Sequence, residues 1–196
     1  MSQYIACCLL EGEGPAIVDP GPTVSLGKLE EGLQQVGLSL DDLGSILLTH
    51  IHLDHAGATG TIVKRNPRIK VYVHGEGVPH MIDPERLLVS VARLYGEHRM
   101  DELFGDFLPV PKENIQSLSG GESLDIADRQ LQVAYTPGHA AHHVSFLDTS
   151  TGTAFVGDTA GIRIANDPLV LPVTPPPDID LEIWESSLQK IEAWKP

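Results

Sequence analysis

Cysteine is scarce in this sequence, and that scarcity excludes a small secreted domain held together by disulfides. The chain has 196 residues but only two cysteines, Cys7 and Cys8, which are adjacent. Neighbouring cysteines build no disulfide framework, and these two lie in an apolar stretch where we expect them to pack as small hydrophobic side chains. Since no signal-peptide pattern is present either, we predict a protein of the reducing cytoplasm.

Basic residues are also few. Thirteen Lys and Arg against twenty-seven Asp and Glu give a formal net charge of −14. Such a charge repels phosphate backbones and anionic lipid surfaces, so neither nucleic acid nor a membrane is an expected partner. No run of apolar residues reaches the length of a membrane span. The expected partner is a small-molecule substrate, and the sequence leaves a homodimer open.

What the sequence does contain is an alternation of strand and helix patterns, which predicts an α/β fold. The length fits a single domain over residues 1–196. Expected strands are Tyr4 to Leu10 and Pro15 to Val18, joined as a hairpin, then Ile46 to Leu48, Ile69 to Val73, Gln130 to Tyr135, His143 to Leu147 and Thr153 to Val156. Expected helices are Leu26 to Val36 and a segment after His55.

Residues Pro79 to Pro109 interrupt this alternation. Pro84 and Glu85 can start a helix there. The apolar residues that follow recur at helical spacing and form one face: Leu87, Leu88, Val91 and Leu94. The pattern predicts a helical insertion.

A proline-rich segment follows Asp158 and runs through Pro177, and its fixed backbone predicts a semi-rigid wall. Asp178 or Asp180 is then expected to cap a last helix. The predicted buried face of that helix consists of Leu181, Trp184, Leu188 and Ile191.

The most informative segment is Thr49-His50-Ile51-His52-Leu53-Asp54-His55-Ala56-Gly57, which packs three imidazoles and one carboxylate into six positions. Neutral imidazoles and carboxylates are the ligands that zinc, non-haem iron or manganese takes from proteins. In extended chain, His50, His52 and Asp54 would point the same way, while His55 would point toward a second site. The alternative is a polar loop rich in histidine by chance, or a fortuitous surface metal site.

Two later positions supply further ligands. His139 follows a predicted strand in Thr136-Pro137-Gly138-His139, and Asp158 follows another in Gly157-Asp158. Ends of several strands converge on one edge of an open α/β sheet. The pattern predicts one site with three nitrogen ligands and a second site that shares a carboxylate with it: His50, His52 and His139 for the first, Asp54 and His55 for the second, and Asp158 between them.

Taken in this order, the His-x-His-x-Asp-His, Thr-Pro-Gly-His and Gly-Asp motifs resemble those of the metallo-β-lactamase-fold hydrolase superfamily. The resemblance extends from Asp19, in a Val-Asp-Pro-Gly turn, to Asp158. It implies a four-layered αββα sandwich with one or two Zn²⁺ ions at one edge of the sheets, iron or manganese being alternatives. It also implies that Asp19 holds a loop or orients a ligand histidine, although turn chemistry alone would make it a turn cap.

The sequence departs from the family pattern at one position. Relatives close the second site with a further histidine after the last helix, and no histidine follows His143 here. We therefore expect either a form truncated at the C-terminus or a protein naturally shorter than its relatives, with a weak or empty second site as the alternative. A single site with three protein ligands and water remains competent. His142 and His143 could be spare ligands. The alternative is that His143 simply begins a strand, while His142 lines the pocket or hydrogen-bonds to the loop.

The resemblance to the glyoxalase II branch implies hydrolysis of a thioester, ester or lactone by metal-activated water, with Asp54 orienting that water and accepting its proton. Glyoxalase II relatives bind glutathione in a further helical domain for which this chain has no room. The insertion at Pro79 to Pro109 and the loop from Gly161 to Pro177 are expected to select the substrate. Alternatives are a mononuclear iron dioxygenase of the persulfide dioxygenase type and a ligand-binding protein with a degenerate site.

Overall fold

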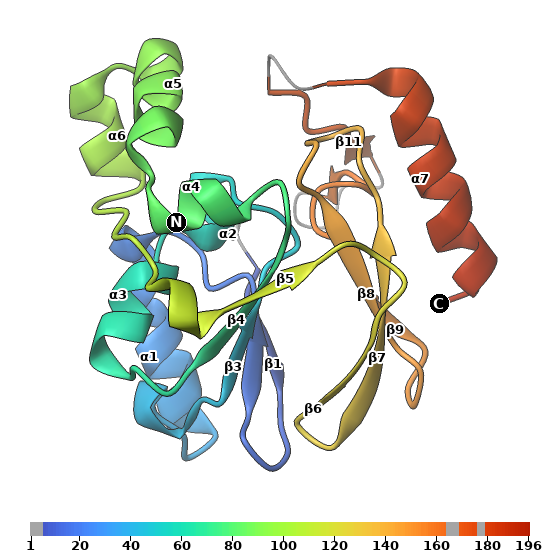
Figure 1. Ribbon diagram of the computed structural model, residues 1–196, viewed down its shortest axis with the longest axis horizontal. Coiled ribbons are helices and arrows are strands. Elements are labelled where there is room, and N and C mark those ends of the chain that lie inside the picture. Colours follow the sequence, from blue (N-terminus) through green and yellow to red (C-terminus); the bar gives the residue numbers. More distant parts are fainter. Residues whose placement is uncertain (1–5, 164–168, 176–178) are drawn as a thin grey trace.

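The computed structural model describes residues 6–163, 169–175 and 179–196. Two β-sheets pack face to face, and helices cover the outer side of each sheet (Figure 1). This arrangement confirms the four-layered αββα sandwich implied by the motifs. Within the described ranges, no helix combines the length and the apolar character needed to cross a membrane.

The first sheet has five strands in the order β1-β2-β3-β4-β5. Their bounds are Cys8–Leu10, Ala16–Val18, Ser45–Leu47, Lys70–His74 and Ile115–Leu118. The first two strands form the predicted antiparallel hairpin, and the remaining pairs are parallel. The helices on its outer face are α1 (Leu26–Gln35), α2 (Leu53–Ala56) and α3 (Thr59–Arg65). The carboxyl ends of the parallel strands therefore meet at one edge of the molecule.

The second sheet is antiparallel, in the order β6-β7-β8-β9. Its strands span Ser123–Ile126, Arg129–Tyr135, Val144–Asp148 and Thr153–Phe155. The last three agree with the predicted strands to within a residue or two at each end. Strands β5 and β6 were not predicted. Each is an edge strand with a single buried residue, Leu118 or Ile126, and therefore shows no apolar run.

Alternate residues of the central strands β2 and β3 face two separate cores. Ile17 and Ile46 pack with the helices, whereas Val18 and Leu47 pack with Phe146 of β8 between the sheets. A fully buried side chain of this size contributes about 1.5–3 kcal/mol. The strand that leads into the histidine-rich segment is thus held from both sides.

The predicted insertion is helical, as expected. It comprises α4 (Val78–Ile82), α5 (Glu85–Tyr95) and α6 (Glu97–Leu103), which project beside the carboxyl ends of the first sheet (Figure 1). Leu87, Leu88 and Val91 are partly buried against the helix-side core. Leu94 shares their face but is 52% exposed, because it borders a cavity described below.

The proline-rich segment after Asp158 contains a short antiparallel pair, β10 (Ile162–Arg163) and β11 (Val170–Leu171). Residues 176–178, the last part of the predicted wall, lie outside the described residues. The alternative cap Asp178 lies among them. The cap of the last helix, α7 (Leu181–Trp194), is Asp180, whose carboxylate accepts a hydrogen bond from the N–H of Ile183 at 3.0 Å.

The buried face of α7 differs from the predicted one. Trp184 and Ile191 are buried as expected, but Leu181 and Leu188 are 70% and 43% exposed. The third buried residue of this helix is Ser187, whose hydroxyl donates a hydrogen bond to the carbonyl of Pro137 at 2.6 Å. Two of the four predicted core positions were therefore wrong, because a buried serine that bonds to backbone carries no apolar signal.

Candidate metal centre

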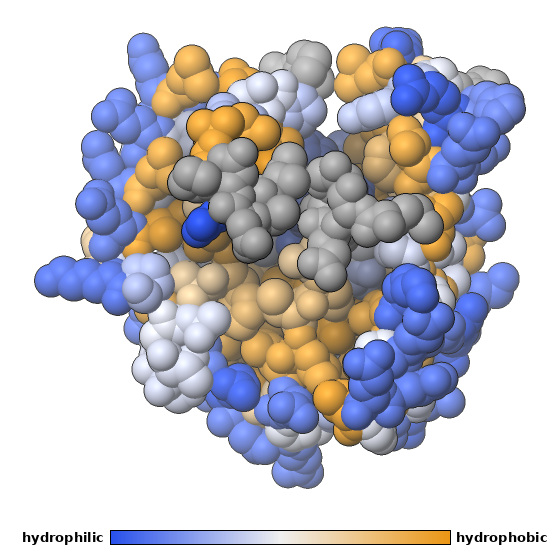
Figure 2. Space-filling model, turned by 180° about the vertical axis from the view of Figure 1, so that it is seen from behind, coloured by the Kyte–Doolittle hydropathy of each residue, from blue (hydrophilic) through white to orange (hydrophobic). Residues whose placement is uncertain are grey.

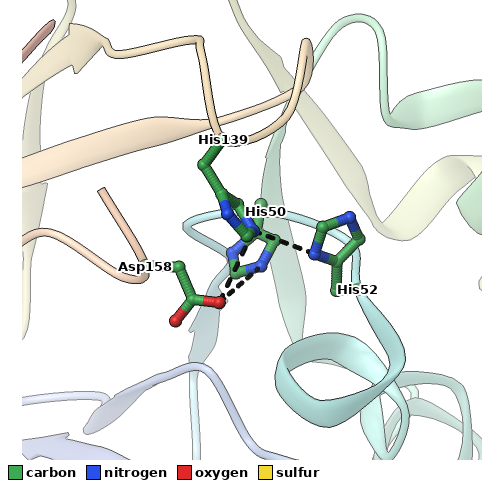
Figure 3. Close-up of side chains that lie close together, drawn as sticks. All are labelled: His50, His52, His139 and Asp158. Atoms are coloured by element: carbon green, nitrogen blue, oxygen red, sulfur yellow. Dashed lines mark hydrogen bonds and ion pairs between the residues drawn. The ribbon is translucent and has the colours of Figure 1, made fainter. Parts of the chain in front are cut away.

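The six predicted ligands lie close together at one edge of the sandwich, where loops of the two sheets converge. Figure 3 shows four of them, His50, His52, His139 and Asp158. His50, His52, His139 and Asp158 offer ligand atoms that all lie within 4.8 Å of one another. Asp54, His55 and Asp158 form a second such group, which shares the carboxylate of Asp158 with the first. A third group, Asp19, His50 and His55, adjoins both of these. The predicted ligands thus lie in adjoining groups, and their division into two metal sites stays a prediction.

One detail of the prediction was wrong. His50 and His52 lie in irregular chain after β3, but the helix α2 begins at Leu53 and places Asp54 in its first turn. Asp54 therefore does not continue a strand alternation with the two histidines and instead groups with His55.

The ring of His50 is oriented by a chain of hydrogen bonds from outside the cluster. The hydroxyl of Thr49 donates to Oδ2 of Asp19 at 2.6 Å, so its oxygen accepts from Nδ1 of His50 at 3.0 Å. The proton of the neutral ring is therefore on Nδ1 and the lone pair on Nε2. That Nε2 is buried, has no hydrogen-bond partner among the described residues, and lies 3.8 Å from Oδ2 of Asp158.

His139 is oriented in the same sense. Its Nδ1 lies 2.8 Å from the carbonyl oxygen of Val173, which can only accept, so Nδ1 carries the proton. The unprotonated Nε2 lies 3.0 Å from Nδ1 of His52 and 3.5 Å from Oδ2 of Asp158. Since Nε2 of His139 accepts, Nδ1 of His52 is the donor between them. The acceptors that face one another are Nε2 of His50, Nε2 of His139 and the carboxylate of Asp158.

His55 lies among three carboxylates. Its Nδ1 is 2.9 Å from Asp19, and its Nε2 is 3.3 Å from Asp158 and 3.8 Å from Asp54. Burial lowers the pKa of His55, but the hydrogen bonds to Asp158 and Asp19 more than reverse this and raise it well above its ordinary value. A positive charge is favoured at this point, and a divalent cation would provide it in place of the proton.

The remaining protonation states also suit a metal. Burial, reinforced by neighbouring imidazoles, lowers the pKa of His50 and His52 well below the ordinary value. Burial raises the pKa of Asp158, but the hydrogen bond and charge of His55 outweigh it, so the pKa is lowered. Neutral imidazoles and an ionised carboxylate are the states that a metal requires of its ligands.

Asp19 supports both groups. Its carboxylate accepts hydrogen bonds from the backbone N–H of Thr49 at 2.8 Å and from the Thr49 hydroxyl, and it also contacts His55. Asp19 is therefore more than a turn cap, because it holds the chain at Thr49 and orients the ring of His55. The residue has a φ of +53°, a left-handed conformation that aspartate tolerates better than most residues.

A glycine brings Asp158 into position. A Cβ atom on Gly157 would lie 2.5 Å from Oγ1 of Thr49 and 2.7 Å from Nε2 of His143, and the φ of this residue is +47°. Only glycine permits both the conformation and the close approach. The loop after β9 can therefore reach the other sheet's histidines.

His142 and His143 are not members of either ligand group among the described residues. His143 is fully buried, with Nδ1 3.0 Å from the hydroxyl of Thr136 and 3.2 Å from that of Thr159. His142 accepts a hydrogen bond at Nδ1 from the N–H of Ile51 at 3.3 Å. The structure supports the alternative for both residues: His142 lines the cavity and bonds to the loop at Ile51, and His143 directly precedes strand β8.

The accepting Nδ1 of His142 places the proton of its ring on Nε2. Burial, with a further contribution from His139, lowers the pKa of His142 to about 3, so the ring is neutral. The side chain lines a cavity beside the cluster. A neutral imidazole with its proton on Nε2 is therefore part of the cavity wall.

This cavity has a volume of about 150 Å³. On one side it is bounded by groups of the histidine cluster, and on the other by the helical insertion and the loop near Val173. Its lining residues are His52, Leu53, Asp54, Leu87, Ser90, Val91, Leu94, Tyr95, Phe104, His142, Asp158, Val173 and Pro175. The helical insertion therefore forms one wall of the cavity next to the histidine cluster.

Two contributors to the centre were missed by sequence reasoning. Thr49 stands directly before His50, so a hydroxyl next to a ligand histidine was a signal that could have been used. Val173 contributes only its carbonyl, from a loop 34 positions beyond His139. No side-chain pattern reports such a contact.

Comparison with known proteins places these features in a family context. Residues 4–195 match the sequence model described as the metallo-beta-lactamase superfamily. The metallo-beta-lactamase fold-containing protein ST1585 of Sulfurisphaera tokodaii is 30% identical over 168 residues, which cover 80% of this chain and 59% of that protein. Hydroxyacylglutathione hydrolase GloC of Haemophilus influenzae is 28% identical over 154 residues, covering 78% of this chain and 65% of that enzyme. The chain spans less than two thirds of either relative.

Solved structures of the same superfamily and of similar fold superpose on this chain. The crystal structure of ST1585 superposes with a TM-score of 0.80 at 26% identity, covering 99% of this chain and 72% of the other. The structure of TTHA1623 in a di-iron-bound form gives a TM-score of 0.66 at 27% identity, covering 98% and 86%.

Proposed function

The chain belongs to the metallo-β-lactamase superfamily, and on that premise we propose that it is a metal-dependent hydrolase acting on a small thioester, ester or lactone. One observation carries the proposal. The Nε2 atoms of His50 and His139 lack protons and face Asp158, and the first of them is buried without a partner among the described residues. Buried acceptors arranged in this way are stabilised by a shared cation.

The donor set fits a divalent ion. One ion would be held by His50, His52, His139 and Asp158, and a second by Asp54, His55 and Asp158. Zinc is the first candidate and iron or manganese the alternatives, since imidazole and carboxylate ligands serve all three. When bound, such an ion lowers the pKa of a bound water to about 7 and supplies hydroxide at neutral pH.

Asp54 is the proposed proton acceptor. Its side chain is 42% exposed and lines the cavity. Burial raises the pKa of Asp54, the charge of His55 opposes this, and the net shift is upward, which makes the carboxylate a better base than an ordinary aspartate. Asp54 would orient the attacking water and receive its proton.

His142 is the proposed donor to the substrate. Its ring lines the cavity and is fixed by the backbone N–H of Ile51, so Nε2–H would be the donor. A fixed donor that meets the developing negative charge on a carbonyl oxygen commonly contributes about 10²–10³ in rate. A small molecule is the partner that a cavity of about 150 Å³ can accept.

The proposal is tested by elemental analysis of protein purified without chelator, combined with hydrolysis assays on a thioester, an ester and a lactone. We expect one or two zinc ions per chain and metal-dependent turnover. His52→Ala should lose metal, whereas His98→Ala, which alters an exposed histidine outside both ligand groups, should not.

Two other outcomes would replace the proposal. One iron per chain with oxygen uptake on a persulfide substrate would assign a dioxygenase. TTHA1623, whose fold is similar, has been solved in a di-iron-bound form. Tight small-molecule binding without turnover at any metal loading would assign a ligand-binding protein.

A further inference from the structure

We propose that the substrate carries an uncharged, apolar acyl or alkyl group of about six carbons, and that this group lies in the cavity against helix α5. The inference rests on the proposed hydrolase function and adds the substrate class to it. It is argued from the shape, charge and size of the cavity.

The far wall of the cavity is apolar. Leu87, Val91 and Leu94 lie on one face of α5 at spacings of four and three residues. Tyr95 and Phe104 join them with their rings in an edge-to-face contact at 5.6 Å, which fixes both side chains. From behind, apolar side chains gather on both sides of the notch at the upper edge of the molecule (Figure 2).

The cavity lining lacks a cationic group that could receive a charged substrate. Among the described lining residues there is no lysine or arginine. The basic residues of α5, Arg86 and Arg93, line a separate hollow together with Val89 on another face of the helix. The acidic lining residues, Asp54 and Asp158, belong to the proposed metal site at the polar end. A carboxylate at the far end of the substrate would therefore meet apolar side chains.

The size of the cavity limits the group. A dry apolar cavity of about 150 Å³ in another protein accepts a benzene ring, and the volume here is about 150 Å³. One ring or a chain of about six carbons fills such a space. The scissile carbonyl would then lie at the polar end, next to His142 and the histidine cluster.

The test is a series of thioesters that share one leaving group and carry acyl groups of two, four, six and twelve carbons. An adipoyl thioester, in which a carboxylate replaces the terminal methyl of hexanoyl, completes the series. With metal-replete protein, kcat/KM should rise by about fourfold per methylene up to hexanoyl and then level off or fall. Adipoyl should be cleaved about tenfold or more slowly than hexanoyl.

Two variants of α5 provide a matched pair. Leu94→Lys places a cation in the cavity and should shift the adipoyl-to-hexanoyl ratio of kcat/KM upward by about tenfold. Val89→Lys makes a similar change on the face away from the cavity and should leave the ratio unchanged. Both positions are about half exposed, at 52% and 48%, so folding tolerates the substitutions.

A second readout does not need turnover. Ligand-observed NMR on metal-free protein should show contact with hexanamide and not with adipamic acid, and Leu94→Lys should reverse the preference. Equal cleavage of all acyl groups, or a preference for adipoyl, would overturn the inference and leave the hydrolase standing. Absence of turnover with the NMR preference intact would overturn the hydrolase and leave the apolar cavity assignment standing.

Discussion

Asp19 accepts a hydrogen bond from Nδ1 of His55 at 2.9 Å, across 36 positions of sequence. The same carboxylate accepts from the hydroxyl of Thr49, which in turn accepts from His50. A single buried side chain therefore fixes the ring tautomers of two histidines that belong to the two neighbouring ligand groups. Carboxylates behind ligand histidines raise the basicity of the ligating nitrogen as well as orienting it.

Replacing this carboxylate should weaken metal binding at both groups. Asp19→Asn keeps the size of the side chain but removes its charge and one acceptor, so we expect metal affinity to fall about 10- to 100-fold. The measurement is competition with a chelator of known affinity. Asp125→Asn, on the exposed side of β6, is the control. An Asp19→Asn variant that retains both ions at the same affinity would show that Asp19 serves only the turn.

Asp54→Ala should remove turnover without unfolding the chain. The carboxylate is 42% exposed, and substitutions at such positions usually change stability by about 0.5 kcal/mol or less. Loss of a general base costs about 10²–10⁴ in rate. The assay is kcat with metal-replete protein, together with the midpoint of thermal unfolding. Full activity in a metal-replete sample would refute the role of Asp54.

Variants of His142 can distinguish a hydrogen bond donated to the substrate from a contribution to metal binding. His142→Ala removes the proposed Nε2–H donor and should lower kcat by about 10²–10³ while KM and metal content stay near their original values. His142→Gln retains an N–H donor and an acceptor for Ile51, so part of the activity should return. Loss of metal in either variant would instead make His142 a support for the cluster.

The sequence predicts those parts of the site that are built from side chains, but not those built from backbone atoms. The clustering of these side chains could be predicted because imidazoles and carboxylates at strand ends form a visible pattern, as for His139 and Asp158. The carbonyl of Val173 could not, because every residue carries one. Apolar spacing assigned Leu188 to the core of the protein. In the structure Leu188 is exposed, and Ser187 is buried instead and hydrogen-bonds to the backbone. Tertiary contacts of this kind override local pattern.

Asp148, which belongs to none of the candidate ligand groups, is expected to make the free energy of unfolding depend on pH in acid. Burial raises the pKa of Asp148, but hydrogen bonds from Ser150 and Arg129 hold it well below its usual value. The unfolded chain binds this proton more readily, so the contribution of Asp148 to stability is full above about pH 5 and is lost as the pH falls through the folded pKa. Asp148→Asn should flatten the decline in the free energy of unfolding below about pH 5. Urea titrations from pH 6 to the acid limit measure it, and an unchanged acid slope would contradict the argument.

The glycine before Asp158 allows the close approach of the two sheets' loops to be tested directly. Gly157 and Gly152 both have positive φ, +47° and +75°, but a Cβ on Gly152 would meet nothing within 4 Å, whereas one on Gly157 would lie 2.5 Å from Oγ1 of Thr49. Both alanine variants incur the left-handed cost of about 1–2 kcal/mol. Only Gly157→Ala must also push apart Thr49 and the loop that carries Asp158. We therefore expect Gly152→Ala to lose some thermal stability and keep its metal, and Gly157→Ala to lose metal affinity as well. Equal metal content in the two variants after chelator challenge would mean that Asp158 reaches the cluster without this close contact.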